Sequence, residues 1–141
     1  MSLQAVLLPL FVEVFLTGGL LVWLGFLRNR DLRGGRVKFG DIALREPKWP
    51  PRTLQAAYSF SNQFELPVLF YVLTILAIIS KHADLLFVIM AWIFVLARLW
   101  HVAIHVTSND VRIRGPVFGI GAVVLAIMWL IFIVRIMLGL P

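Results

Sequence analysis

Apolar residues along the chain gather in four long blocks, which cover about residues 3–27, 54–80, 85–106 and 117–138. Each block has about the ~20 residues that an α-helix needs to cross the hydrocarbon core of a bilayer. Only the connection over residues 28–52 is long. Because consecutive spans cross in opposite directions, the pattern predicts an all-α integral membrane bundle of four helices, running up-down-up-down, with residues 1–141 forming a single membrane domain.

Composition agrees with this pattern. Of the 141 residues, 61% are hydrophobic and 14% are charged, whereas ordinary globular domains are about half apolar and about a quarter charged. These values exclude a soluble enzyme domain and a disordered chain. Cysteine is absent, which excludes disulfides, thiolate metal sites and a cysteine nucleophile. Any thiol chemistry therefore needs a thiol that a small molecule supplies.

The net charge is +6, and the basic residues behind it are unevenly placed. Ten of the 13 lie in the first and third connections. The ten are Arg28, Arg30, Arg33, Arg36, Lys38, Arg45, Lys48, Arg52, Arg112 and Arg114. The positive-inside rule predicts that these two connections are cytoplasmic and that both termini lie outside. Contact with anionic lipid is expected. Nucleic-acid binding is not expected, because no aromatic residues alternate with the basic ones to stack bases.

Two sets of polar residues occur inside the second and third blocks at helical spacing, so each set lies on one helix face. The sets are Tyr58, Asn62 and Glu65, and Arg98, His101 and His105. The connection over residues 81–84 is short, so the two spans form a hairpin. At 1.5 Å per residue, Glu65 and Arg98 lie about 22 and 21 Å from the turn. This predicts a buried Glu65–Arg98 ion pair, followed by Asn62 level with His101 and Tyr58 level with His105.

The paired polar faces have several interpretations. The ion pair alone could serve only helix register, or the set could line a polar cleft that opens to the cytoplasm. A metal site using His101, His105 and Glu65 has suitable ligand types. Metal binding is not expected, because Arg98 beside the site would repel a cation. Glu13 near the middle of the first block favours a different class, a proton-coupled transporter of small molecules.

Local signals refine the element boundaries. Asp84 is a plausible N-cap for the third span. Pro67 removes a backbone donor within the second span and predicts a kink there. Pro116 suits the first position of the fourth span, after a polar connection over residues 107–115.

The stretch from Asn62 to Pro67, Asn-Gln-Phe-Glu-Leu-Pro, together with Arg98, His101, His105 and Arg112, resembles the MAPEG family of membrane proteins in eicosanoid and glutathione metabolism. The resemblance covers all four spans. It implies a trimer of four-helix subunits that binds glutathione in clefts between neighbouring subunits, open to the cytoplasm.

The resemblance also implies roles for individual residues. Asn62 and Glu65 match the family's Asn-x-x-Glu, which holds the glutathione backbone. Arg98 matches the arginine late in the third span, and His101 and His105 stand where many members carry glutathione-contacting tyrosines. Arg112 matches the arginine that stabilises the glutathione thiolate, and Arg114 is close enough to compete for that role. The chain departs from the family at Tyr58, where arginine is common, and at both histidines.

The resemblance implies a glutathione-dependent transferase or peroxidase that acts on a lipophilic electrophile, with glutathione as co-substrate. The lipophilic electrophile would reach the protein through the lipid bilayer. Arg112 is the expected catalytic residue. Two alternatives remain at this point: a proton-coupled transporter that uses Glu13, and a family member without catalysis.

Overall fold

The computed structural model describes residues 1–44 and 48–141. Its helices are α1 (Leu3–Arg33), η1 (Phe39–Ile42), α2 (Pro51–Asn62), α3 (Leu66–Ile79), α4 (Leu85–Val106) and α5 (Val111–Met137). No strand occurs in the described ranges. Four helical stretches are long and apolar enough to cross a membrane, and α2 with α3 forms the second of them. The predicted all-helical membrane protein with four spans is therefore confirmed. Arg45, counted among the basic residues of the first connection, lies outside the described residues.

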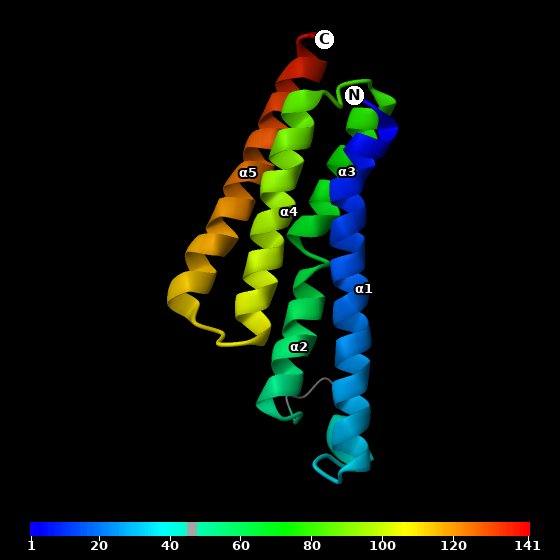
Figure 1. The fold of residues 1–141 in the computed structure, drawn as a ribbon, viewed down its shortest axis with the longest axis vertical. Coiled ribbons are helices and arrows are strands. Elements are labelled where there is room, and N and C mark those ends of the chain that lie inside the picture. The colour runs from blue at the N-terminus through cyan, green and yellow to red at the C-terminus, as the bar shows by residue number, and fades with distance from the viewer. Residues whose placement is uncertain (45–47) are drawn as a thin grey trace.

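The two chain ends lie at the same end of the bundle, together with the connection between α3 and α4 (Figure 1). We call this the termini end. The described part of the connection after α1 and the connection between α4 and α5 lie at the opposite end, which we call the loop end. α4 runs from the connection at residues 80–84 towards the loop end. Its polar residues are in the later part of the helix, so they lie in the half of the bundle nearer the loop end.

Side-chain caps define where the helices begin. Asp84 caps α4 as predicted, since its Oδ1 accepts a hydrogen bond from the Phe87 backbone N–H at 3.0 Å. Asp110 caps α5, accepting from the backbone N–H of Arg112 at 3.0 Å. The prediction that the fourth span begins at Pro116 was wrong, because the cap at Asp110 starts the helix earlier and Pro116 lies inside α5.

The second span is broken between α2 and α3. The backbone N–H groups of Gln63, Phe64 and Glu65 each bond to the carbonyl three residues earlier, at 3.0–3.2 Å, in place of the α-helical pattern. Pro67 lies in the first turn of α3, where its missing N–H costs nothing. The predicted irregularity at Pro67 is therefore present, as an interruption that turns the chain before the proline.

The main core fills the half of the bundle towards the termini end and is built from α1, α3, α4 and α5. Phe70 of α3 and Phe94 of α4 are fully buried there, with ring centroids 4.9 Å apart. A smaller cluster of Leu24, Leu27 and Ala56 joins α1 to α2. Many large apolar side chains point outwards, among them Phe15 and Val22. An apolar outer surface of this extent suits contact with lipid or with neighbouring subunits.

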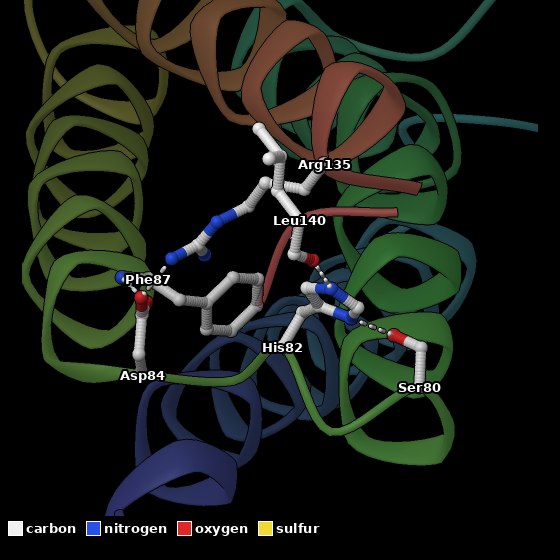
Figure 2. Close-up of polar contacts among 6 residues, drawn as sticks. All are labelled: Ser80, His82, Asp84, Phe87, Arg135 and Leu140. Carbon is white, nitrogen blue, oxygen red and sulfur yellow. Dashed lines mark hydrogen bonds and ion pairs between the residues drawn. The ribbon is translucent and has the colours of Figure 1, made fainter. Parts of the chain in front are cut away.

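Polar contacts close the termini end (Figure 2). Arg135 of α5 forms an ion pair with Asp84 at 2.5 Å. The His82 Nε2 donates to the Leu140 carbonyl oxygen at 2.9 Å, and its Nδ1 lies 3.0 Å from the Ser80 hydroxyl. The connection between α3 and α4 is thus tied to the end of α5 by two separate contacts.

Candidate functional site

Arg98 lies at the centre of a polar cluster between α2 and α4. Its side chain is only 2% exposed, and its Nη2 donates a hydrogen bond to the Oδ1 of Asn62. The Nδ2 of Asn62 in turn donates to the Oε2 of Glu65 at 2.9 Å. Asn62 therefore connects a buried cation on α4 with a carboxylate that follows α2.

The predicted buried ion pair between Glu65 and Arg98 was wrong. Glu65 is exposed, and none of the ion pairs among the described residues joins it to Arg98 directly. The reason is the break at residues 63–65, which removes Glu65 from the continuous helix face that carries Asn62. The charges of Glu65 and Arg98 still interact, with the Asn62 amide between them.

A second carboxylate approaches Arg98 from α1. The side chain of Glu13 is 0% exposed, and both of its carboxylate oxygens lack a hydrogen-bond partner among the described residues. Its charge interacts with that of Arg98. Glu13 is thus enclosed within the bundle, beside the cation of the polar cluster.

The two histidines continue the polar face of α4 towards the loop end. His101 and His105 are both buried, with ring centroids 5.6 Å apart, and Phe118 of α5 lies 5.6 Å from the His101 ring. Each Nδ1 lacks a hydrogen-bond partner within the described part of the chain. The set considered for a metal does not converge, since the described residues contain no group of three ionisable ligands that could hold one.

The two candidate arginines of α5 have different surroundings. Arg114 is half-buried, its charge acts on both His101 and His105, and its Nη1 donates to the Oδ1 of Asn109. Arg112 is exposed in the first turn of α5. Residues two apart point to different sides of a helix. Within one subunit, the fold therefore brings Arg114 towards the histidines and leaves Arg112 on the surface.

Tyr58 does not pair with His105, although the residue count along the hairpin had put the two at the same level. It is 54% exposed and lines a cleft between α1, α2 and the first connection. No contact between Tyr58 and His105 occurs among the ring contacts and hydrogen bonds of the described residues.

Sequence reasoning missed two buried polar residues at the end of α2, Ser59 within the helix and Gln63 as its C-cap. The Nε2 of Gln63 donates to the Ser59 carbonyl oxygen at 2.9 Å. The Oε1 of Gln63 and the Oγ of Ser59 are buried without a partner among the described residues. Their spacing of one helical turn, next to Asn62, was the available signal.

Asp31, near the loop end of α1, was also missed. Its side chain is 0% exposed, its Oδ2 accepts a hydrogen bond from Thr53 of α2, and Arg30 and Arg36 lie at 3.8 and 3.6 Å. Its place among closely spaced arginines suggests a solvent-exposed residue, so the local sequence carried no signal of its burial. Asp31 ties the start of the first connection to α2.

The cluster as a whole is equipped to bind a polar ligand. Buried polar groups in proteins are nearly always hydrogen-bonded, yet several donors and acceptors here lack protein partners in the described residues. These atoms are the Nε and Nη1 of Arg98, the Nδ1 of His101 and His105, the Oγ of Ser59 and the Oε1 of Gln63. Together with the exposed Glu65 carboxylate, they offer complementary groups to a ligand that carries both charges.

Comparison with known proteins identifies the family. No curated protein and no solved structure matches the chain. The family model of the MAPEG family matches residues 6–134, which is nearly the whole chain and includes every residue of the polar cluster. Members of this family have glutathione-related roles or roles in eicosanoid metabolism at membranes. The chain therefore belongs to the MAPEG family.

Proposed function

We propose that the protein is a membrane-bound glutathione-dependent transferase or peroxidase that acts on a lipophilic electrophile. The observation that carries the proposal is the connected set Arg98–Asn62–Glu65, in which a buried cation orients an amide and the amide orients an exposed carboxylate. Family membership supports the same class of ligand. The active form is a trimer of up-down-up-down bundles, with glutathione held between subunits.

Glutathione carries two carboxylates, an ammonium group, two peptide bonds and a thiol. The Glu65 carboxylate suits its ammonium group, since an exposed anion beside a donor amide can accept a charge-assisted hydrogen bond. The N–H groups of Arg98 suit its carboxylates, and the Nδ1 atoms of His101 and His105, which lack partners among the described residues, suit its peptide groups. Asn62 fixes the side chains of Glu65 and Arg98 relative to each other, because it forms a hydrogen bond with each of them.

Arg112 is the proposed catalytic residue. The chemistry needs a thiolate, whereas a free thiol has a pKa of about 8.5 and is mostly protonated at neutral pH. The chain has no cysteine of its own. An arginine supplies a permanent positive charge that stabilises the thiolate. The thiolate sulfur then forms a bond to the electrophilic atom, and the leaving group departs with the electron pair of the broken bond. Arg112 is exposed in the single subunit, so it is accessible to a ligand in a cleft between subunits.

The placement of basic residues supports a cytoplasmic site. Ten of the 13 basic residues belong to the first and third connections in the sequence, and the described parts of both connections lie at the loop end. The positive-inside rule assigns this end to the cytoplasm, with both termini outside. Glutathione is an anion, so a basic rim attracts it to the site. The lipophilic partner reaches the same depth through the bilayer.

Calorimetric titration of glutathione into the detergent-solubilised protein tests the proposal. We expect saturable binding that Asn62→Ala weakens by about tenfold or more, the scale of one lost charge-assisted hydrogen bond. Asn29→Ala is the matched control, since Asn29 is exposed on α1 and outside the cluster. Absence of saturable binding to the unmodified protein would contradict the proposal. Binding without turnover of any electrophile would instead favour a family member that has lost catalysis.

A further inference from the structure

Glu13 belongs to the buried face of α1 and not to its outer side. The buried residues of this helix recur at steps of three, four or seven positions, which places them on one face. They are Val6, Pro9, Glu13, Leu20, Leu24, Leu27 and Asp31. Val6 and Leu10, on the two turns before Glu13, belong to the main apolar core or pack against it. The Glu13 carboxyl group is therefore enclosed by packed helices, where a charge is costly unless it has a partner.

The charged partner of this carboxyl group is Arg98 of α4. At about 1.5 Å per residue, Glu13 lies about 15 Å from the start of α1 and Arg98 about 20 Å from the start of α4, both measured from the termini end (Figure 1). The two residues are thus at similar depth in the bundle, and their charges act on each other. Tyr71 of α3 faces the same place, because the charges of Glu13 and Arg98 both act on it. The charge of Glu65 acts on Arg98 as well.

Glu13 and Arg98 attract each other without a hydrogen bond between them. Within the described ranges, both Glu13 carboxyl oxygens and the Nε and Nη1 of Arg98 lack a partner, while the Nη2 of Arg98 is bonded to Asn62. The hydroxyl of Thr17, one turn along α1, donates to the backbone carbonyl oxygen of Glu13 at 3.1 Å. The ionised form of Glu13 therefore depends on the positive charge of Arg98 and not on hydrogen bonds to the carboxylate.

An anionic ligand at the polar cluster competes with Glu13 for that charge. Glutathione carries one more carboxylate than it has ammonium groups. In the proposed site a carboxylate of glutathione bonds to the free N–H groups of Arg98, and the ammonium group bonds to Glu65. Arg98 then has a nearer counter-ion, so it stabilises the ionised form of Glu13 less. A buried carboxylate that loses its counter-charge becomes neutral by binding a proton.

We propose that Glu13 is a proton-binding site coupled to the polar cluster. The carboxylate takes up a proton from the solvent when an anionic ligand binds to Arg98, and it releases the proton when the ligand leaves. This coupling rests on the proposed function and adds a pH dependence to it. Because the proton and the anion each favour the binding of the other, the affinity for the anion rises as the pH falls through the range in which Glu13 titrates.

Calorimetry counts the protons directly. S-methylglutathione is titrated into the detergent-solubilised protein at several pH values between about 5 and 8, at each pH in two buffers that differ in ionisation enthalpy. The difference in binding heat gives the number of protons taken up, and the thioether has no thiol proton to release. We expect a maximum of more than about half a proton per bound ligand, and an affinity that falls as the pH rises.

Matched variants assign the proton to Glu13. Glu13→Gln should abolish the uptake and flatten the pH profile, and its affinity should equal that of the unmodified protein at the acid end of the range. Asp41→Asn, in the exposed first connection, should keep the uptake. A second measurement needs no ligand, because a protonated Glu13 has an infrared C=O band that Glu13→Gln removes. At about pH 8, Arg98→Gln should strengthen this band, whereas Arg114→Gln, whose charge acts on the histidines, should not.

Binding of S-methylglutathione without proton uptake, or uptake that persists in Glu13→Gln, would overturn the coupling and leave the proposed function intact. An infrared band that Arg98→Gln leaves unchanged would overturn it as well. Absence of binding by both glutathione and S-methylglutathione would contradict the proposed function, and the infrared comparison would still decide whether Arg98 controls the proton on Glu13. If Arg98→Gln fails to fold, calorimetry on the unmodified protein and Glu13→Gln decides alone.

Discussion

Arg98 of α4 donates a hydrogen bond to the side-chain oxygen of Asn62, at the end of α2. Both side chains lie at the break in the second span, and the bond crosses the contact between the two spans of the hairpin. A buried guanidinium in the bilayer is costly unless it is paired. The hydrogen bond to Asn62 stabilises the buried guanidinium, and so do the negative charges of Glu13 and Glu65.

A double-mutant cycle on this pair should show strong coupling. Arg98→Leu, Asn62→Leu and the double variant are compared by chemical unfolding in detergent. We expect a coupling energy of about 1.5–3 kcal/mol, typical of a hydrogen bond to a charged group. The same cycle with Glu65→Leu should give a smaller value, because Glu65 is exposed and reaches Arg98 through Asn62. Stronger coupling for Glu65 than for Asn62 would contradict the arrangement.

A substitution of Glu13 distinguishes the proposed enzyme from the alternative of a proton-coupled transporter. Its side chain is enclosed within the bundle beside Arg98, and α1 presents it to neither side of the membrane. In acidic buffer we expect Glu13→Gln to leave glutathione affinity nearly unchanged, since Gln keeps the shape of the side chain. A pH gradient across proteoliposomes should drive no flux of lipophilic cations. A gradient-driven flux that Glu13→Gln abolishes would establish the transporter instead.

The ion pair between Asp84 and Arg135 predicts acid sensitivity at the termini end. Hydrogen bonding to Arg135 holds the pKa of Asp84 below its usual value of 3.8. A carboxyl whose folded pKa is depressed stabilises the fold above its unfolded pKa, and this contribution is lost as the pH falls through the folded pKa. The thermal midpoint of the unmodified protein should therefore fall below about pH 4 more steeply than that of Asp84→Asn.

Asn retains the N-cap of α4, so the Asp84→Asn comparison isolates the charge. Asp41→Asn is the matched control, because Asp41 is exposed and lies in the first connection. Identical pH profiles for the unmodified protein and Asp84→Asn would show that the pair adds no stability in solution.

The sidedness of the membrane can be tested directly. The basic first and third connections predict that both termini face away from the cytoplasm. A reporter enzyme that is active only outside the cytoplasm should be active when fused after Pro141. A reporter that is active only in the cytoplasm should be inactive at the same position. The reverse result would invert the orientation of the proposed glutathione site.

The sequence predicted the features that depend on length and local chemistry. The four spans follow from apolar runs, and the cap at Asp84 follows from its position before α4. The sequence also brought the polar residues of the second and third spans together, and Asn62 does meet Arg98, although the residue count had put Asn62 level with His101. Counting residues along a continuous helix nevertheless paired Arg98 with Glu65, since it took no account of the break at residues 63–65.

Other features depend on tertiary packing and have no local signature. Asp31 lies in a charged segment that looks solvent-exposed, and only its contact with Thr53 of α2 buries it. The different surroundings of Arg112 and Arg114 depend on the rotation of α5 about its axis. Because α5 begins at Val111 and not at Pro116, both arginines lie on the helix and not in the connection before it.

The thiol pKa of bound glutathione, measured by ultraviolet titration of the thiolate on the purified protein, is the most direct test of the proposed chemistry. We expect a pKa about two units below that of free glutathione, equivalent to roughly 2.7 kcal/mol and a hundredfold in thiolate near neutral pH. Arg112→Ala should return the pKa towards the free value while glutathione still binds, and Arg114→Ala should change it far less. A bound thiol that titrates like free glutathione, or a pKa that depends on Arg114 and not on Arg112, would contradict the assignment.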